Sequence, residues 1–410
     1  MNRVVVTGIG IVSPLGNTIE DFWRNIVSGK NGISEINSFD TSGYDVHIAG
    51  QCKINLQHYF DKKTLNKNDK FTAYAIIAAD QAFKDSNLDL KKINHDKSGV
   101  IIGSGIGGMN TFESQYKKLL KNPRRVSPFF IPSMIPDIAA GQVAIKYGFK
   151  GVNYSILSAC ASSSHCIGDA FRNIKHGYAD IIITGGSEST ITPSAIAGFS
   201  NMKALTKNTD IKTASRPFDS DRDGFVMGEG SGILVLEKLE HALNRNAKIY
   251  AEIIGYGATA DAFHLTSPNP DGYGACKAMK LAIKESGLDN KNFQYINAHG
   301  TSTKQNDFIE TKAIKKVFKD HSNKISISST KSMIGHLLGA SGSVEMISTI
   351  LSIKNSIIPP TINYSTKDPD CDLDYVPNES ISKSVDNALS NSFGFGGHNS
   401  VIAVGKYQNK

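Results

Sequence analysis

The sequence predicts an α/β protein with largely parallel sheets covered by helices. Short apolar runs rich in β-branched residues alternate with longer segments of helical periodicity along the whole 410-residue chain. Many of the 37 glycines lie in short loops between these runs rather than in low-complexity tracts. Because the chain is too long for one ordinary core, we expect two domains or two halves packed as one body.

The first half of the chain alternates buried strands with helices. Five apolar runs are typical of buried strands: residues 4–12 (VVVTGIGIV), 98–105 (SGVIIGSG), 152–159 (VNYSILSA), 180–186 (DIIITGG) and 232–238 (GILVLEK). Helices are expected between them at residues 72–87 and 162–177. Strands that alternate with helices in this way favour parallel pairing.

The second half repeats this alternation. Strands are expected at residues 248–257, 293–300, 324–330 and 400–405, and helices at residues 274–287, 306–320 and 342–356. The segment AEIIGYG at 251–257 resembles VVVTGIG near the start, since each is a strand followed by G-x-G. We therefore predict two intimately packed halves, 1–250 and 251–410, because no Pro/Ser-rich linker separates them.

The sequence predicts neither a membrane span nor a signal peptide. No apolar run approaches the roughly 18 residues of a span. The start, MNRVVVTGIG, is a strand and a turn rather than a basic, an apolar and a small-residue region. We therefore expect a cytoplasmic protein, although a removed organelle transit peptide would leave no trace.

Cysteine spacing and charge exclude several classes of protein. The five cysteines are scattered and form no C-x-x-C pair, which argues against a disulfide framework and a zinc site. The net charge of +7 comes mostly from dispersed lysines and would suit an acidic partner or solubility. The longest basic runs are pairs without interleaved aromatic residues, so we expect no nucleic-acid binding.

The glycine-rich stretch GSGIGG at 103–108 satisfies G-x-G-x-x-G. A dinucleotide site also needs an acidic residue about 20 residues further on. The segment PRRVSP at 123–128 contains none, so we interpret GSGIGG as a tight turn. No P-loop motif is present.

Cys160 lies in SACASSSHCIG, between an expected strand and an expected helix. The positive end of a helix and its free N–H groups favour the thiolate, which is the nucleophilic form of cysteine. From this segment alone, a buried structural cysteine is the alternative.

Three further segments carry candidate chemistry. His299 follows an expected strand in YINAHGTST, where α/β proteins gather their sites; a loop histidine bonded to threonines is the alternative. Lys331 follows another strand and precedes His336 and Glu345, although a snorkelling lysine would fit as well. The glycines of NSFGFGGHNS at 391–400 would bring backbone N–H groups close to a ligand.

Together these segments resemble the β-ketoacyl-acyl carrier protein synthase family of thiolase-fold condensing enzymes. The matching motifs follow the family order over roughly residues 3–404: RVVVTGIGIVSPLGN, GSGIGG, PRRVSPFFIPS, SACASSSHCIGDA, TGGSES, ASRPFDSDRDGFVMGEG, YINAHGTST, SSTKSMIGHLLGASG, PPTIN and NSFGFGGHNS. The resemblance implies a thiolase-like fold, a duplicated α-β-α-β-α layered architecture with two mixed, largely parallel sheets. It also implies an acyltransferase of fatty acid synthesis that needs no metal or organic cofactor.

The resemblance assigns the catalytic roles. Cys160 would hold the acyl chain, and His299 and His336 would stabilise the charge formed when malonyl-ACP loses CO2. Lys331 would orient the histidines and Glu345 would anchor it. Phe395 would supply an oxyanion-hole N–H, together with that of Cys160, and would gate the acyl pocket.

The remaining roles that the resemblance implies concern substrate and partners. Ile106 would shape the acyl pocket and favours the type II branch of the family. Thr301 and Thr303, and less clearly Thr266, would bind the pantetheine arm. The partner would be acidic acyl carrier protein, and a homodimer is implied. The residues at family docking positions are Lys63, Lys67, Arg124, Arg125 and Lys203.

Departures from the family motifs and alternative functions complete the interpretation. Ser158 stands where the family often has Thr, and Cys166 where it often has Asn, which affects only the shape of the acyl channel.

A type I or polyketide-type ketosynthase is the nearest alternative. A cysteine hydrolase would explain the 139 residues between Cys160 and His299, but not Lys331. A non-catalytic partner subunit would lack the nucleophile.

Overall fold

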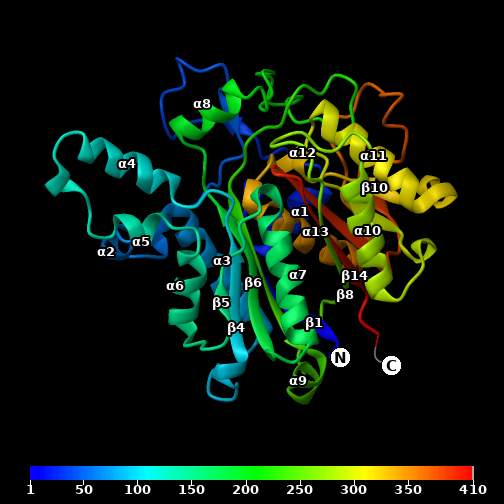
Figure 1. The fold of residues 1–410 in the computed structure, drawn as a ribbon, viewed down its shortest axis with the longest axis horizontal. Helices are drawn as coiled ribbons and strands as arrows, with labels where there is room; N and C mark the ends of the chain where they lie inside the picture. Colours follow the sequence, from blue (N-terminus) through cyan, green and yellow to red (C-terminus); the bar gives the residue numbers. More distant parts are fainter. Residues whose placement is uncertain (409–410) are drawn as a thin grey trace.

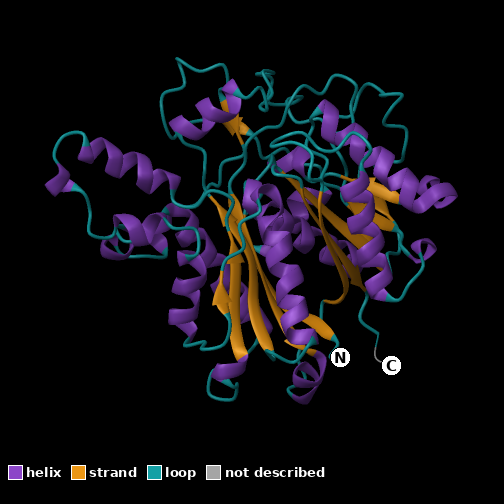
Figure 2. Cartoon of the chain, viewed as in Figure 1, coloured by secondary structure: helices purple, strands orange, loops and turns teal. Residues whose placement is uncertain are grey.

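A mixed β-sheet of ten strands forms the centre of the computed structural model, which describes residues 1–408 (Figures 1 and 2). The strand order is β10-β9-β13-β14-β8-β1-β7-β6-β4-β5. The first half of the chain supplies β1 (Val4–Val12), β4 (Ser98–Gly103), β5 (Asn153–Tyr154), β6 (Ile181–Glu188) and β7 (Gly230–Lys238). The second half supplies β8 (Ala251–Ala260), β9 (Tyr295–Asn297), β10 (Ser326–Ser328), β13 (Asn387–Gly394) and β14 (His398–Gly405).

The two halves of this sheet have the same topology. Outward from the centre, β1, β7, β6, β4 and β5 correspond to β8, β14, β13, β9 and β10. In each half the first two neighbouring pairs are antiparallel and the next two are parallel. The predicted duplicated α/β architecture is therefore confirmed.

The sheet differs from the expectation in continuity and strand direction. The two halves are hydrogen-bonded into one sheet, because β1 pairs with β8 over Val4–Val6 and Ala251–Ile253. Among the described strands, five of the nine pairings in this sheet are antiparallel, two in each half and one between them. An apolar run predicts a buried strand but not its direction, and the short turn between β13 and β14 forces antiparallel pairing.

Helices complete a layered structure (Figure 1). On the outside, α3 (Lys70–Ser86) and α6 (Ile138–Tyr147) cover the first half, and α10 (Tyr273–Ser286) and α11 (Lys304–Phe318) cover the second. Between the halves, α7 (Ser162–Lys175) and α13 (Ser341–Asn355) contact strands of both. The central position of α13 explains why its residues are buried on every side from the start of the helix to Ile353, the small polar ones included.

Shorter elements surround this frame. The short helices are α1 (Ile19–Val27), α2 (Lys62–Leu65), α4 (Met109–Leu119), α5 (Phe130–Met134), α8 (Pro193–Asn201), α9 (Leu239–Asn244) and α12 (Lys331–Ile334). Two small antiparallel sheets pair β2 (Ser34–Glu35) with β3 (Ile48–Ala49) and β11 (Ile357–Ile358) with β12 (Ile381–Ser382). The segment with α4 and α5 projects to one side in Figure 1. None of the helices within residues 1–408 has the length and apolar character that crossing a membrane requires.

One predicted strand is much shorter than expected. The run 152–159 forms a strand only over Asn153–Tyr154, which pairs with β4 at the edge of the sheet. In the part of the chain that the structure describes, β5 is the edge strand and ends at Tyr154, so the chain has left the sheet before Cys160. The five predicted helices are confirmed by α3, α7, α10, α11 and α13.

Candidate active site

A cavity of about 490 Å³ is lined by residues of both halves of the chain. Its wall contains eight of the predicted site residues: Cys160, Lys203, Thr266, His299, Thr301, Thr303, His336 and Phe395. The cavity thus gathers one thiol and two imidazoles from distant segments. Such a group of nucleophile, proton donors and backbone N–H groups suits acyl transfer.

Cys160 lies in a 3₁₀ turn, Ala159–Ala161, directly before α7. Ala159 has a φ of 51°, in the left-handed region that non-glycine residues rarely adopt. The Ser162 hydroxyl fixes the turn, since it accepts from Ser158 N at 2.9 Å and donates to Ala159 O at 2.7 Å. Strained backbone that its surroundings hold in place is typical of functional sites.

Burial raises the pKa of the Cys160 thiol to about 11. Lys331 and the backbone N–H groups of Phe395 and Cys160 lower this pKa, but desolvation of the thiolate outweighs them. The start of a helix favours the thiolate and would lower the pKa, so this rise in the pKa of Cys160 is opposite to the expectation from the sequence. The thiol is therefore protonated at neutral pH, and its proton must leave during acylation. The two N–H groups at the sulfur are placed to stabilise an oxyanion formed there.

The two histidines both line the cavity, and their rings lie next to each other in an edge-to-face arrangement. Their ring centroids are 5.3 Å apart with the planes at 84°, and each residue is 2% exposed. Burial, and next the Lys331 charge, hold the pKa of both well below the usual range, so both are neutral at pH 7. The Lys331 Nζ lies 3.4 Å from His299 Nδ1. Because an ammonium can only donate, His299 Nδ1 is the acceptor and its Nε2 carries the proton.

Lys331 is buried and held by two groups. It pairs with the Glu345 carboxylate and donates to the carbonyl of His299 at 2.6 Å. Burial raises the pKa of Glu345 to about 7, against the opposing pull of Lys331. The structure thus joins the lysine, the glutamate and the first histidine in the chain of contacts that the sequence predicted.

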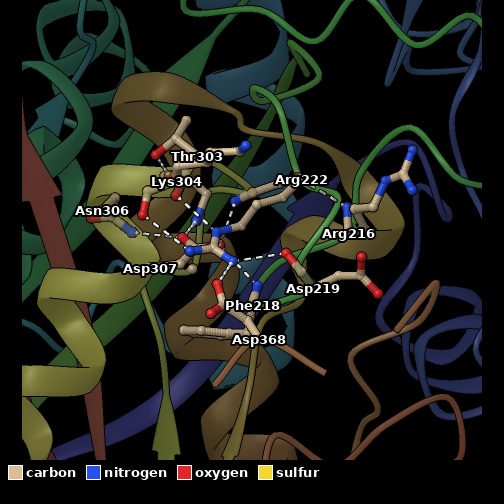
Figure 3. A network of polar contacts seen from close by, with 12 residues as sticks. Arg216, Phe218, Asp219, Arg222, Thr303, Lys304, Asn306, Asp307 and Asp368 are labelled. Carbon is tan, nitrogen blue, oxygen red and sulfur yellow. Dashed lines mark hydrogen bonds and ion pairs between the residues drawn. The ribbon is translucent and has the colours of Figure 1, made fainter. Parts of the chain in front are cut away.

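A buried network that the sequence analysis missed fixes the loop with Thr301 and Thr303 (Figure 3). Asp307 accepts from Thr301 N at 2.9 Å, and Arg222 lies 3.6 Å from that carboxylate. Arg222 also donates to Thr303 O at 3.3 Å and to Asp368 at 2.5 Å. The two threonine hydroxyls lie 2.8 Å apart at the cavity.

Glu310 was also missed. Its carboxylate accepts from the backbone N–H groups of His299 at 2.9 Å and Gly300 at 2.8 Å, and from Asn391 at 3.0 Å. It therefore fixes the turn of the first histidine. The available signal was the pair of acids Asp307 and Glu310 at helical spacing beside an apolar face, but the spacing does not identify their partners.

Ile106 lines a second, apolar cavity of about 290 Å³ rather than the first. Gly108, Met109, Phe112 and Met134 are among the other residues in its wall. The role of Ile106 in shaping an acyl pocket therefore remains a prediction about this second cavity.

The predicted docking residues lie on the surface. Lys63, Arg124, Arg125 and Lys203 are exposed, and Lys67 is half-buried with its ammonium 4.7 Å from the centre of the Phe129 ring. Lys203 alone of these five lines the first cavity. Their docking role stays a prediction.

Within residues 1–408 no group of three or more His, Cys, Asp or Glu side chains is arranged to hold a metal ion.

Comparisons with known proteins agree on one family. The family model described as "Beta-ketoacyl synthase, N-terminal domain" matches residues 1–242, and the corresponding C-terminal domain model matches residues 250–365. The chain is 53% identical over 408 residues to 3-oxoacyl-[acyl-carrier-protein] synthase 2 of Staphylococcus aureus, covering 99% of each. It is 51% identical to the protein of that name from Synechocystis sp., covering 99% of this chain and 98% of the relative.

The similar solved structures are also ketosynthases. A type II polyketide ketosynthase in complex with its acyl-carrier protein is 36% identical, with a TM-score of 0.93 over 99% of this chain and 100% of that one. A beta-ketoacyl synthase from Burkholderia phymatum STM815 is 32% identical, with a TM-score of 0.92 over the full length of both chains.

Proposed function

The chain belongs to the β-ketoacyl synthase family, and from this premise we propose that it is a 3-oxoacyl-[acyl-carrier-protein] synthase of the second type. It condenses malonyl-ACP with an acyl chain held on Cys160, releases CO2, and forms a β-ketoacyl-ACP two carbons longer. One observation carries the proposal: Cys160, His299 and His336 line a single cavity at the junction of the two halves.

The first half-reaction is acyl transfer from acyl-ACP to Cys160. The sulfur attacks the thioester carbonyl and the thiol of the carrier arm leaves with the cysteine proton. The N–H groups of Cys160 and Phe395 would stabilise the oxyanion, each worth about 3 kcal/mol of barrier. Lys331 supports the reaction by lowering the pKa of the cysteine.

The second half-reaction is decarboxylation and condensation. When malonyl-ACP loses CO2, negative charge develops on its thioester oxygen. Neutral His299 can donate from Nε2 to this oxygen because Lys331 occupies its other nitrogen. His336 would supply the second donor, with Ser341 Oγ 2.9 Å from its Nδ1. The carbanion then attacks the Cys160 thioester and frees the sulfur. No cofactor takes part in these steps.

The carrier protein is the partner that the proposed reaction requires. Thr301, Thr303 and Thr266 line the cavity and could hydrogen-bond its pantetheine arm. The exposed basic residues Lys63, Arg124, Arg125 and Lys203 would contact its acidic surface, since opposite charges steer association. Lys203, both exposed and cavity-lining, would stand closest to the arm.

A homodimer also belongs to this proposal. Within residues 1–408 no strand pairs with the outer edge of β5, and Tyr154 in this strand and Leu157 after it are 38% and 50% exposed. An exposed edge with apolar side chains favours pairing with a second copy of the chain. Sedimentation equilibrium tests this, with Tyr154→Lys combined with Leu157→Lys as the variant that should yield monomers.

The division into halves 1–250 and 251–410 and the cytoplasmic location remain parts of the proposal. The repeated strand order supports the division, and the last two residues of the second half lie outside the described part of the chain. The relatives are named as bacterial enzymes of acyl-ACP condensation, which supports the location. Immunodetection in fractionated cells would test it.

Mass spectrometry of the protein after incubation with acyl-ACP tests the function. The wild type should carry the acyl group on Cys160 and then release a β-ketoacyl-ACP when malonyl-ACP is added. Acylation of Cys166 instead, or hydrolysis without a condensation product, would overturn the assignment.

A polyketide-type ketosynthase is the second candidate, because one of the similar solved structures is such an enzyme. It would extend one chain repeatedly without reduction between steps. Incubation with acyl-ACP and excess malonyl-ACP distinguishes the two, since the synthase proposed here should release the product of a single extension.

A further inference from the structure

Each half of the duplicated fold contains a 3₁₀ turn that starts a central helix. Ala159–Ala161 precedes α7, and Leu338–Ala340 precedes α13. Both turns begin with a residue in the left-handed region, Ala159 at φ 51° and Leu338 at φ 46°. Gly339 is therefore the counterpart of Cys160, and its N–H group is the counterpart of the cysteine N–H.

The strands that end beside these two turns carry different residues. In the second half, β13 ends at Gly394, which pairs with the first residue of β14. A Cβ atom at Gly394 would lie 3.1 Å from Cys160 N, so the missing side chain leaves that N–H group open. In the first half, β6 ends at Glu188, which pairs with the first residue of β7. Its carboxylate accepts from Gly339 N at 3.0 Å.

Both oxygens of the Glu188 carboxylate accept hydrogen bonds. Oε2 also accepts from Gly105 N at 2.7 Å, and Oε1 accepts from the Ser104 hydroxyl at 3.1 Å. The side chain is fully buried, and no cationic group within residues 1–408 forms an ion pair with it. A buried carboxylate held only by neutral donors is costly, and burial raises its pKa to about 7.

The carboxylate joins the walls of the two cavities. Gly105 precedes Ile106, which lines the apolar cavity. Gly339 follows Leu338, which lines the catalytic cavity and is itself in a strained conformation. A Cβ atom at Gly105 would lie 3.4 Å from Ala159 O, so the Ile106 turn also packs against the nucleophile turn.

We propose that Glu188 is a positioning residue that sets the acyl-chain length. Its carboxylate occupies the counterpart of the Cys160 oxyanion site and holds the Ile106 turn against the Leu338 turn. This inference rests on the proposed function, because it supposes an acyl chain on Cys160. The proposal places the end of a long acyl chain in the apolar cavity that Ile106 lines, where the hydrogen bond from Gly105 N to Glu188 resists movement of the Ile106 turn.

The test compares acyl loading of Cys160 from tetradecanoyl-ACP and hexanoyl-ACP. Glu188→Gln keeps the size of the side chain but places an NH2 group against backbone donors. We expect the ratio of kcat/KM for the long chain to that for the short chain to rise about fivefold, the value of roughly one hydrogen bond. A folded variant whose ratio stays within about twofold of the wild type would overturn the proposal.

Two further measurements separate positioning from a general loss of stability. In Glu188→Ala, formate should fit between the freed donors and restore the ratio toward the wild-type value, whereas chloride at equal ionic strength should not. In a double-mutant cycle with Ile106→Ala, the effect of Glu188→Gln on the ratio should disappear, because Ile106 transmits it. The absence of a formate response beyond that of chloride, or an additive cycle, would contradict the proposal.

Glu237→Gln is the matched control. Glu237 is another fully buried carboxylate of the first half, on β7, and it is bound by Thr7, His241 and Arg245. Its replacement should lower the melting temperature without changing the ratio, and an equal change of ratio would show that any buried defect suffices. Failure of wild-type Cys160 to become acylated would overturn the proposed function, whereas acylation with an unchanged ratio would overturn only the role of Glu188.

Discussion

The two halves of the molecule have the same strand topology and contribute different side chains to one cavity. The first half places Cys160 at the start of α7, and the second places His336 just before the start of α13. The second half also contributes His299 and Phe395 to the same cavity, and its Lys331 lies 3.4 Å from His299 Nδ1. The comparison teaches that the repeated fold supplies two equivalent turns that differ in single residues, Cys160 at one and Gly339 at the other.

The two turns also differ in what faces their backbone N–H groups. Gly394 leaves the N–H group of Cys160 open, whereas Glu188 occupies that of Gly339. An open N–H group in a cavity can stabilise a transient anion, and an occupied one can only hold structure. The following predictions test this difference, from the largest expected effect to the smallest.

Removal of the nucleophile should have the largest effect. Cys160→Ala should lower the rate of condensation by about a thousandfold or more, because no second residue can carry the acyl chain. Cys166→Ala is the control and should retain most activity, since that thiol lies in the apolar core. The rate of β-ketoacyl-ACP formation measures both. Substantial turnover by Cys160→Ala would break the distinction between the two halves.

Filling the open site should come next. In Gly394→Ala the new Cβ atom would lie 2.7 Å from Ser158 O and 3.1 Å from Cys160 N. We expect acyl loading to fall by about a hundredfold, the loss typical of an impaired oxyanion hole. Gly198→Ala, whose Cβ atom would meet nothing within 4 Å, should load normally. Normal loading by Gly394→Ala would contradict the open site.

Removal of His299 should separate the two half-reactions. His299→Ala should slow malonyl-ACP decarboxylation by about a hundredfold, because a donor to the developing charge is lost. Acyl loading of Cys160 should fall far less. CO2 release and acylation, measured separately, check this. Equal losses would show that the second half does not act mainly in decarboxylation.

The pH dependence of Cys160 should report how the second half acts on the first. Because burial raises the pKa of this thiol to about 11, its thiolate fraction should rise about tenfold per pH unit from pH 7 to 9. Iodoacetamide alkylation of the Cys160 peptide, followed by mass spectrometry, should rise in parallel. A rate that is flat above pH 7 would show that the thiolate already predominates.

The same measurement tests Lys331. Its charge lowers the pKa of Cys160, so its removal should raise that pKa and slow alkylation severalfold at each pH. Lys331→Met combined with Glu345→Gln avoids leaving a lone buried carboxylate. Unchanged alkylation in this double variant would show that Lys331 does not act on the nucleophile.

The smallest effect should come from the surface charges. Arg124→Ala or Lys63→Ala should raise KM for acyl-ACP about two- to threefold, since an exposed charge contributes little singly. Both should leave KM for acyl-pantetheine unchanged, because that substrate lacks the carrier protein. A KM for acyl-ACP that is insensitive to salt and to these changes would overturn the docking role of the basic residues.

Local patterns in the sequence predicted the main elements and singled out Cys160, and the family resemblance gave its role. The apolar runs and helical periodicities predicted the main strands and helices, because the face that an element buries sets the spacing of apolar residues within its own segment. Cys160, His299 and Lys331 were singled out because each follows an expected strand, and the carboxyl ends of strands meet at α/β sites. His336 was singled out because it follows Lys331. Motif order supplied the family, which spacing alone did not.

The tertiary structure alone decided the features that depend on distant segments. The sequence did not reveal the joining of the halves through β1 and β8, since an apolar run carries no strand direction. It did not reveal Glu188, Asp307 or Glu310, because their donors come from other loops. The pKa of Cys160 also required the fold, since desolvation depends on every segment packed around the sulfur and here outweighs the charges that oppose it.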